Sequence, residues 1–292
     1  ILKKYVDAQL QIEQTDKYWN GPFSFVQLAD SQFGLLKDNI SWDEEKNMLR
    51  LAIEHINSMR PRPRFVVICG DMINAMPSNE NQILRKRQTS DLLDTLKNLN
   101  TEIRLVYVPG NHDIGNRPTS YTITNYKKEW GPDFFHFWIS GVLFLVLNTQ
   151  LYVDNSGAPH EAEQQDKWLH TQLTKQAIIA VHTVIFCHIP PFINQVDEDN
   201  NYSNLPKLVR RKLLKQTKDA GVSKWMCGHT HKNKISWFGN MEIISSSAVG
   251  SVFDKNNKFI ANISNSGLRV VHVTNKKISH NFYTLDTFPV EY

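Results

Sequence analysis

Apolar residues recur along this chain with two different periods, which predict alternating strands and helices. Continuous apolar runs at Phe23–Ala29, Phe65–Cys69 and Arg104–Val108 are typical of buried strands. Between them, apolar residues recur at helical spacing over Trp42–Ser58 and over residues 81–99, which predicts two amphipathic helices. This β-α-β-α-β order indicates parallel strands joined by right-handed crossovers.

The start of the first helix has a local signal of its own. Ser41 is followed three residues later by Glu44, which is the spacing of a capping box. We therefore expect the side chains of Ser41 and Glu44 to cap this helix.

The second half of the chain continues with shorter elements. Helices are predicted near residues 119–130, at Glu161–Gln176 and at Lys207–Asp219, and strands at Phe134–Ile139, Val142–Leu147, Val181–Cys187 and Val222–Cys227. Ser140-Gly141 is predicted to form a hairpin-like turn, and the polar, proline-bracketed residues 191–206 a long loop. The last strands, at Lys234–Phe238, Met241–Ser245, Leu268–Val273 and Ile278–Tyr283, are expected to be antiparallel.

The sequence contains no repeat, low-complexity tract or convincing linker. We therefore expect one α/β domain over residues 1–292, in which two mixed β-sheets pack face to face between helices. Residues 1–20 are expected to form a peripheral N-terminal extension. This segment carries too many charges for a signal peptide, and because the chain begins with Ile, a leader removed before residue 1 stays open.

Composition narrows the class of protein. Apolar residues make up 41% and charged residues 21%, as in ordinary globular proteins, and no apolar run reaches the roughly 18 residues of a membrane span. The net charge of +4 is too small to predict a nucleic-acid partner. Three basic clusters, Arg60/Arg62/Arg64, Arg85-Lys86-Arg87 and Arg210-Arg211-Lys212, are expected to be solvated faces of helices and loops.

The three cysteines, Cys69, Cys187 and Cys227, each end an apolar stretch. In that setting a free thiol behaves as a small buried hydrophobic group, and an odd number of cysteines does not indicate a disulfide framework. A reducing, cytoplasmic setting is therefore predicted.

Five of the predicted strands are followed by residues that can bind a metal ion. These residues are Asp30, Asp71, Asn111-His112-Asp113, His188, and His229 with His231. Each one alone also fits a bland role, because Asp and Asn serve in caps and turns and a histidine often faces solvent. Together, carboxylate and amide oxygens with imidazole nitrogens form a ligand set for Mn, Fe or Zn. A shared aspartate suits two ions about 3.5–4 Å apart, which can hold both oxygens of a phosphoryl displacement.

The order of these motifs resembles that of the calcineurin-like metallophosphoesterases. The motifs are DSQ at 30–32, GD at 70–71, GNHD at 110–113, CH at 187–188 and GHTH at 228–231. The wider segments GPFSFVQLADSQFGL, CGDMINAMP, PGNHDIGN, GVLFLVLNTQ and SSSAVG resemble the branch of calcineurin-like phosphoesterase-domain-containing serine/threonine phosphatases. The resemblance covers nearly the whole chain and implies the four-layer sandwich of that family.

The resemblance also implies a role for each motif residue. The first metal would be held by Asp30, Gln32, Asp71 and His231, and the second by Asp71 as a bridge, Asn111, His188 and His229. His112 would act as a general acid or transition-state stabiliser, and Asp113 would orient its imidazole. The nucleophile would be a hydroxide that bridges the two metals.

Gln32 stands where most members of the superfamily have a histidine. An amide oxygen is a harder and usually weaker ligand than an imidazole nitrogen, which disfavours Zn or Fe at that site relative to Mn or Mg. We expect two divalent ions drawn from Mn, Fe, Zn and Mg, a labile first metal, and activity that depends on added Mn²⁺.

These features predict a metal-dependent phosphomonoesterase, a serine/threonine protein phosphatase whose partners are phosphorylated proteins or small phosphoesters. Neither a membrane nor a nucleic acid is expected as a partner. Two alternatives stay open: a phosphodiesterase of cyclic nucleotides or nucleic acid, and a non-catalytic binding scaffold with the same fold.

Several further residues are ambiguous in the sequence. Substrate-binding candidates are Asn111, His112 and Gln150, the last of which also fits a turn. The acidic stretch Asp197-Glu198-Asp199 fits either a solvated loop or a gate that favours basic phosphopeptides. The remaining histidines have no partner pattern and are expected to be structural: His55, His136, His160, His170, His182, His272 and His280.

Overall fold

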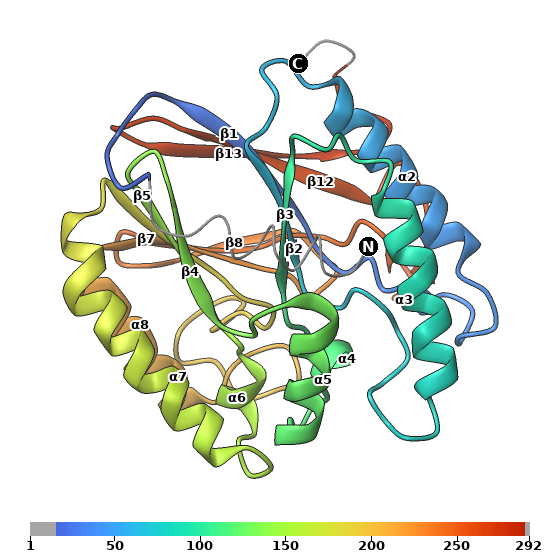
Figure 1. Cartoon of the computed structure of the whole chain (residues 1–292), viewed down its shortest axis with the longest axis horizontal. Helices are drawn as coiled ribbons and strands as arrows, with labels where there is room; N and C mark the ends of the chain where they lie inside the picture. Colours follow the sequence, from blue (N-terminus) through green and yellow to red (C-terminus); the bar gives the residue numbers. More distant parts are fainter. Residues whose placement is uncertain (1–15, 290–292) are drawn as a thin grey trace.

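Two mixed β-sheets lie face to face in this computed structural model, which describes residues 16–289 (Figure 1). The first sheet has the strand order β13-β12-β1-β2-β3. Its strands are β1 (Phe23–Leu28), β2 (Phe65–Cys69), β3 (Arg104–Val108), β12 (Gly267–Val273) and β13 (Ile278–Thr284). The strands β1, β2 and β3 are parallel, whereas β12 and β13 extend the sheet in antiparallel fashion.

The second sheet has the order β4-β5-β6-β7-β9-β8. Its strands are β4 (Phe135–Ile139), β5 (Val142–Val146), β6 (His182–Phe186), β7 (Val222–Cys227), β8 (Lys234–Phe238) and β9 (Met241–Ser245). Four of them, β5, β6, β7 and β9, are parallel, and antiparallel β4 and β8 form the edges. The expectation that the last strands are all antiparallel is therefore wrong for β9, which pairs in parallel with β7. Short turns in the sequence indicate only that β8 pairs with β9 and β12 with β13. The pairing of β9 with β7 joins strands that are not consecutive, so the tertiary structure decides it.

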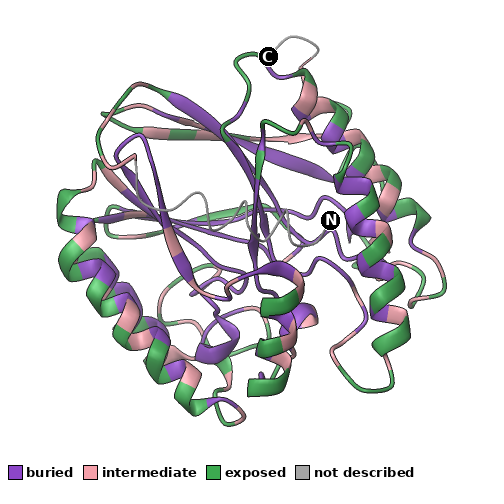
Figure 2. Ribbon diagram, viewed as in Figure 1, coloured by how far each residue is buried: buried purple, intermediate pink, exposed green. Residues whose placement is uncertain are grey.

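Helices cover the outer face of each sheet and complete four layers (Figure 1). Helices α2 (Asp43–Ser58) and α3 (Gln82–Leu96) cover the first sheet, and α7 (Pro159–Thr171) and α8 (Lys207–Asp219) cover the second. Side chains that alternate along a strand enter different cores. On β1, Phe25 lies between the sheets, whereas Val26 packs towards α2 and α3. Figure 2 shows the result as buried strands inside helices with exposed outer faces. The predicted fold class is confirmed.

The inter-sheet core is rich in aromatic rings. Phe25 stacks on Phe65 with ring centroids 4.6 Å apart, and Phe144 stacks on Phe186 at 5.5 Å. Phe25 meets Phe144 edge-on at 5.5 Å, so the stacks join the two sheets. Contacts between aromatic rings have preferred geometries. They therefore fix the carboxyl ends of the parallel strands in one sheet relative to those in the other.

The shorter elements lie around these layers. They are α4 (Asn111–Ile114), α5 (Ser120–Trp130), α6 (Gln150–Val153), a π-helical turn (Gln172–Gln176), a 3₁₀ turn (Ala177–Ile179), β10 (Val252–Phe253) and β11 (Phe259–Ile260). The helix near 119–130 was predicted, and the π-helical turn lies within the predicted helix Glu161–Gln176. The other elements, of two to four residues, are too short to show a period. The Ser140-Gly141 turn is confirmed between β4 and β5, with φ angles of 48° and 74°.

The predicted capping box at the start of α2 is wrong. Trp42 takes the N-cap position, where its side chain does not cap the helix, and the helix begins at Asp43. Glu44 lies at the surface near Lys37. Glu45 is buried instead, and its carboxylate accepts the backbone N–H of Leu36 at 2.8 Å. The first turn of the helix thus contacts the preceding loop through Glu45, which the capping-box spacing does not indicate.

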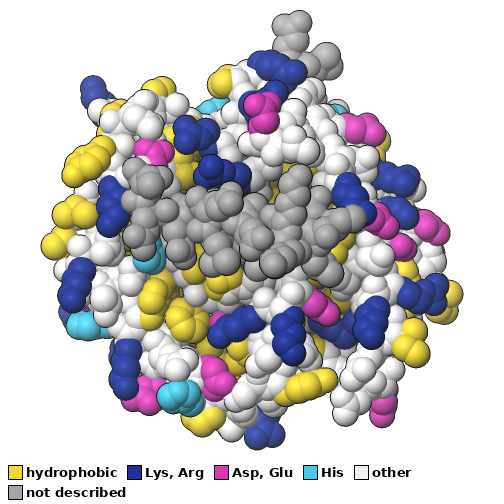
Figure 3. Space-filling view, in the orientation of Figure 1, with side chains coloured by type: hydrophobic (Ala, Val, Ile, Leu, Met, Phe, Trp, Pro, Cys, Tyr) yellow, Lys and Arg dark blue, Asp and Glu magenta, His cyan; other side chains and the backbone are white. Residues whose placement is uncertain are grey.

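Two members of the basic clusters are buried rather than solvated. Arg85 and Arg210 donate hydrogen bonds to backbone carbonyls of neighbouring loops, so their charge serves to fix the backbone. On the face shown in Figure 3, Lys and Arg side chains lie interspersed with acidic and hydrophobic ones. The three cysteines are free and buried.

Two expectations concern the N-terminal segment and membrane spans. The predicted extension over residues 1–20 falls mostly outside the described residues, which begin at residue 16. Among the helices of residues 16–289, none has the length and apolar character needed to cross a membrane.

Candidate metal centre

The carboxyl ends of β1, β2 and β3 meet those of β6 and β7 where the two sheets face each other. The backbone N–H of Asp30 donates to the carbonyl of Gly70 at 3.1 Å, and that of Gly228 donates to the carbonyl of His188 at 3.0 Å. Close packing joins the two sheets here, because a Cβ atom at Gly228 would lie 2.7 Å from both Asp30 Oδ2 and the carbonyl of Cys69. Residues that are far apart in sequence therefore surround one buried space.

The backbone is strained where the predicted ligands lie. Positive φ angles occur at Asp30 (51°), Gln32 (35°), Asp71 (53°), His229 (70°) and His231 (52°). Residues with a side chain rarely adopt this conformation, and such residues cluster at functional sites because the surrounding structure must compensate for the strain. Here the positive φ angles turn the polar side chains that follow the buried strands towards the inside of the site.

Four of the predicted ligands converge on one point. His188 Nε2 lies 3.3 Å from Asp71 Oδ2, 3.1 Å from Asn111 Oδ1 and 3.1 Å from His229 Nδ1. Ligand atoms of Asp71, His188 and His229 lie within 4.8 Å of one another, and all three residues are buried. Two imidazole nitrogens, a carboxylate and an amide oxygen at this separation form a set of donors that fits a divalent cation.

Each of the three histidines has one ring nitrogen fixed by a backbone carbonyl. His188 Nδ1 contacts the carbonyl of Cys69 at 2.8 Å, His229 Nε2 that of Tyr202 at 2.8 Å, and His231 Nδ1 that of Ser251 at 2.5 Å. Since a carbonyl accepts only from an N–H, these contacts assign the proton to the outer nitrogen. The inner nitrogen of each ring faces the centre, where its lone pair can bind a metal ion once this nitrogen is deprotonated, which is the usual arrangement of metal-binding histidines.

The remaining predicted ligands are Asp30, Gln32 and His231. His231 Nε2 is 3.5 Å from Asp30 Oδ1. The Gln32 amide donates from Nε2 to Asn74 Oδ1 at 3.2 Å, while its buried Oε1 has no hydrogen-bond partner among the described residues. A buried amide oxygen without a partner is costly, and a metal ion in front of it would remove that cost. Gln32 therefore fits the expected first metal as an oxygen donor.

The buried ionisable groups of the centre shift one another's pKa values, and these shifts indicate a site that favours positive charge. Burial raises the pKa of Asp30 well above its usual range. Burial acts in the same direction on Asp71, but the charges of His188 and His112 outweigh it and lower the pKa of that carboxyl group. Burial disfavours a charged His188, yet Asp71 raises the pKa of this imidazole to about 10. Burial and the charge of His188 together lower the pKa of His229 to about 3. Carboxylates that raise the pKa of a buried imidazole in this way favour bound cations.

The contacts of His112 and Asp113 differ from the sequence-based expectation. The Asp113 carboxylate accepts three backbone N–H groups, from Gly110 at 2.8 Å, Asp71 at 2.8 Å and Met72 at 3.1 Å. The imidazole of His112 is held by the carbonyl of Asn74, which lies 2.5 Å from Nδ1. The expected contact between Asp113 and this imidazole is therefore wrong. The side chains of His112 and Asp113, which are adjacent in α4, point in different directions. Asp113 therefore fixes the backbone of the site through its hydrogen bonds to N–H groups.

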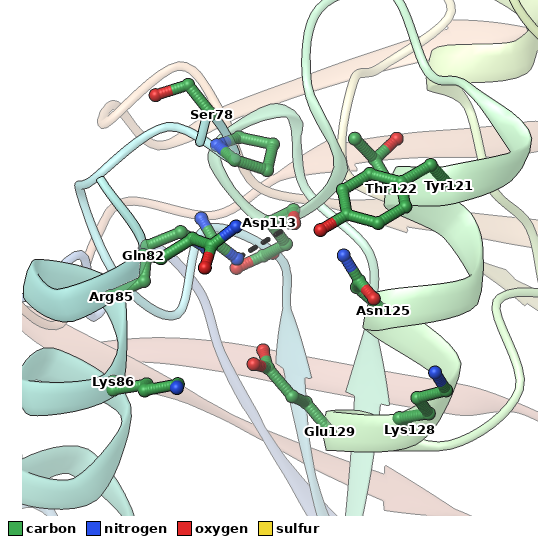
Figure 4. A pocket seen from close by; sticks show the side chains of 11 residues that line it. Ser78, Gln82, Arg85, Lys86, Asp113, Tyr121, Thr122, Asn125, Lys128 and Glu129 are labelled. Atoms are coloured by element: carbon green, nitrogen blue, oxygen red, sulfur yellow. Dashed lines mark hydrogen bonds between the residues drawn. The ribbon is translucent and has the colours of Figure 1, made fainter. Parts of the chain in front are cut away.

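A pocket lies next to the loop over residues 110–113, between α3 and α5 (Figure 4). It has a volume of about 220 Å³, and polar side chains line most of it, among them Lys86, Asn125 and Glu129. Buried Arg85 borders the pocket and donates to the carbonyls of His112 at 2.8 Å and Asp113 at 3.0 Å. Sequence reasoning missed this contact, because an arginine within a basic cluster gives no local signal of burial.

Two further expectations concern the rim of the site. Gln150 is fully buried as the first residue of α6, so it does not serve in a turn, and its substrate role stays a prediction. In the acidic stretch, Asp197 pairs with Arg211 at 2.5 Å, whereas the Glu198 carboxylate accepts the N–H groups of Ile193 and Asn194, both at 2.8 Å. Glu198 thus holds the loop together, whereas Asp197 and Asp199 are exposed, as expected for a solvated loop. The role as a gate stays a prediction.

Comparison with known proteins agrees with this geometry. The family described as calcineurin-like phosphoesterase matches residues 23–233. The serine/threonine-protein phosphatase CPPED1 of Mus musculus is 40% identical over 283 residues, which cover 94% of this chain and 87% of that protein. CPPED1 of Homo sapiens is 40% identical over 284 residues, with 94% and 87% covered.

Solved structures share the fold at low sequence identity. A dimetal phosphatase from Danio rerio superposes with a TM-score of 0.61 at 14% identity, covering 90% of this chain and 100% of that one. GAP50, the anchor in the inner membrane complex of Plasmodium, superposes with a TM-score of 0.64 at 18% identity, covering 94% and 88%. The family match and the CPPED1 relatives, which extend over nearly all of the chain, show that this protein belongs to the calcineurin-like phosphoesterase family.

Proposed function

We propose that this protein is a phosphomonoesterase that uses two divalent metal ions and acts on phosphoserine and phosphothreonine in proteins. The observation that carries the proposal is the orientation of the three buried histidines, each of which fixes one nitrogen on a carbonyl and turns the other inwards. A scaffold that had lost catalysis would have no reason to keep all three inner nitrogens available.

The assignment of ligands follows the two groups of donors. Asp30, Gln32, Asp71 and His231 would hold the first ion, and Asp71, Asn111, His188 and His229 the second. When bound, the two ions would neutralise the phosphate group and supply an activated water molecule as the nucleophile. The Gln32 oxygen, which has no hydrogen-bond partner within residues 16–289, supports Mn or Mg at the first site, while the imidazole-rich second site also suits Zn or Fe.

Residues of the chain itself would bind and protonate the substrate. His112 is half-buried, and Asn74 holds its Nδ1, so we assign proton transfer to the leaving oxygen to Nε2. Arg85 and Asp113 fix the backbone on either side of this residue, which keeps the imidazole in place during the reaction. Asn111 and Gln150 remain candidates for contact with the substrate.

The choice of phosphoserine and phosphothreonine rests on the relatives. CPPED1 proteins of several vertebrates, named serine/threonine-protein phosphatases, are 39% to 41% identical to this chain. The free, buried cysteines support a reducing, cytoplasmic setting for such a substrate.

A comparison of substrates tests the proposal. Purified protein with added Mn²⁺ should hydrolyse p-nitrophenyl phosphate and phosphoserine or phosphothreonine peptides, and should act more slowly on bis-p-nitrophenyl phosphate. The Asp71→Asn variant should lose at least about a hundredfold in kcat, because the shared carboxylate would be gone. Faster turnover of the diester would favour a phosphodiesterase, and an unchanged rate in Asp71→Asn would refute metal-dependent catalysis at this centre.

A further inference from the structure

The loop over residues 191–206 contributes a tyrosine to the rim of the candidate metal centre. Asn111 Nδ2 donates a hydrogen bond to the hydroxyl oxygen of Tyr202 at 2.8 Å. His229 Nε2 contacts the backbone carbonyl of the same tyrosine at 2.8 Å, and the two rings lie with centroids 4.9 Å apart. One residue thus contacts two of the four residues assigned to the second ion.

Both contacts select the orientation that a metal ligand needs. An amide side chain presents oxygen and nitrogen on opposite sides, so holding Nδ2 of Asn111 outwards directs its Oδ1 inwards, where it lies 3.1 Å from His188 Nε2. The carbonyl of Tyr202 likewise keeps the proton of His229 on Nε2 and leaves Nδ1 for the centre. Outer contacts of this kind set ligand orientation and strengthen metal binding.

The loop that carries Tyr202 is built to hold it in place. Buried Arg210 donates to the carbonyls of Val196 at 2.7 Å and Leu205 at 2.8 Å. The Glu198 carboxylate accepts N–H groups at the start of the loop and the Asn204 side chain at 2.7 Å near its end. Within the acidic stretch, Glu198 therefore links the start of the loop to its end.

We propose that Tyr202 is a positioning residue for the second metal ion, and that Glu198 supports it by closing the loop. This inference rests on the proposed assignment of Asn111 and His229 as ligands. It gives one residue of the acidic stretch a role, since Glu198 would help to prepare the metal ligand set.

Metal titration of Tyr202→Phe and three further variants tests this role without reference to catalysis. Tyr202→Phe removes the hydroxyl and keeps the ring and the carbonyl. Because Tyr202 is 64% exposed, its loss should leave the melting temperature of the metal-free protein unchanged. Titration of metal-free protein with Mn²⁺ by calorimetry should show two sites in the wild type. In Tyr202→Phe the Kd of one site should rise about tenfold or more, while the other stays constant.

Two neighbouring variants separate the loop from the hydroxyl. Glu198→Ala should weaken the same site, because the loop loses its closing contacts, whereas Asp197→Asn affects only a surface pair with Arg211 and should titrate like the wild type. Tyr18→Phe, at an 86% exposed tyrosine away from the centre, is the control for loss of a hydroxyl. Excess Mn²⁺ should restore kcat in Tyr202→Phe, since the lost affinity is then compensated.

Unchanged Mn²⁺ affinity at both sites in Tyr202→Phe would overturn the inference, and so would an equal change in Asp197→Asn. The proposed function fails on a different result, namely a wild-type protein that binds two ions and hydrolyses no phosphoester. The two failures can therefore be told apart.

Discussion

The carboxylate of Asp113 accepts the backbone N–H of Asp71 at 2.8 Å, which links the GNHD loop to the shared carboxylate of the metal centre. Asp71 lies at a positive φ of 53°, and Asp113 contributes one of the contacts that hold this strained turn. A Cβ atom at Gly110 would lie 2.2 Å from Asp71 N, so the two loops touch with no space for a side chain. The strand ends of β2 and β3 therefore act as one unit.

Asp113→Asn should disturb metal binding rather than proton transfer. An amide places an NH₂ group against the N–H donors of Gly110, Asp71 and Met72, and at least one of them loses its acceptor. We expect a lower metal content per chain together with a lower kcat. His112→Asn should lower kcat and leave the metal content unchanged. Metal analysis beside steady-state rates checks this, and a full metal complement in Asp113→Asn would contradict it.

Gln32→His should convert the first site into a stronger one for zinc. The buried Gln32 oxygen has no partner among residues 16–289, and an imidazole at this position would offer a nitrogen donor in its place. Zn²⁺ affinity measured by competition with a chelator should rise at one site, and the activity of the purified protein should depend less on added Mn²⁺. Asn74→Ala removes the partner of the Gln32 amide nitrogen together with the hydrogen bonds from Asn74 to Asn39 and Gly34, and it serves as the control for altered packing. Two equally tight zinc sites in the wild type would refute the premise.

Arg85→Lys should lower kcat while metal binding is kept. The guanidinium donates to the carbonyls of Ala75, His112 and Asp113 from a buried position, and a lysine cannot reproduce this fork. Loss of a buried hydrogen bond to a charged group costs about 1.5–3 kcal/mol, so the free energy of unfolding should fall by about that amount. Arg87→Lys is the matched control, since Arg87 lies on the same helix over the ring of Trp42. Denaturant unfolding and kcat measured in parallel would show whether the two variants differ.

Glu242 should make stability depend on pH in the acidic range. This carboxylate lies between Lys224 and His280, with Arg269 2.8 Å from the other nitrogen of that imidazole. Burial acts to raise its pKa, but hydrogen bonds from His280 and Lys224 prevail and lower the pKa to about 2. A lowered carboxyl pKa stabilises the folded state above the unfolded value of about 4.3, and this stability is lost as the pH falls towards 2.

Thermal unfolding of the wild type and Glu242→Gln checks this prediction. The difference in Tm between the two proteins should be largest near neutral pH and should shrink as the pH falls from about 4.5 towards 2. A difference that stays constant over this range would show that Glu242 acts through packing and not through its charge. Glu163→Gln, an exposed glutamate on α7 that pairs with Lys167, should show a much smaller difference at every pH.

The fold and the elements of the centre follow from local patterns. Periods of two and of three to four residues distinguish strands from helices, and the β-α-β order implies parallel pairing with strand ends on one edge. For this reason Asp30, Asp71, Asn111, His188, His229 and His231 can be grouped from the sequence alone, since each follows a buried apolar run. The class of fold and the family required nothing more than these motifs and their order.

Contacts between segments distant in sequence were decided by the tertiary structure alone. The parallel pairing of β9 with β7, the burial of Arg85 and Arg210, and the partner of each histidine depend on loops whose shape has no period. Adjacent side chains such as His112 and Asp113 differ in direction because α4 turns between them, which no spacing rule predicts. Tyr202 lies in a polar loop without any motif, and contacts within this loop, among them those of Glu198 and Arg210, hold it near Asn111 and His229. The sequence thus determined which groups could bind metal, and the packing of loops decided how each is oriented.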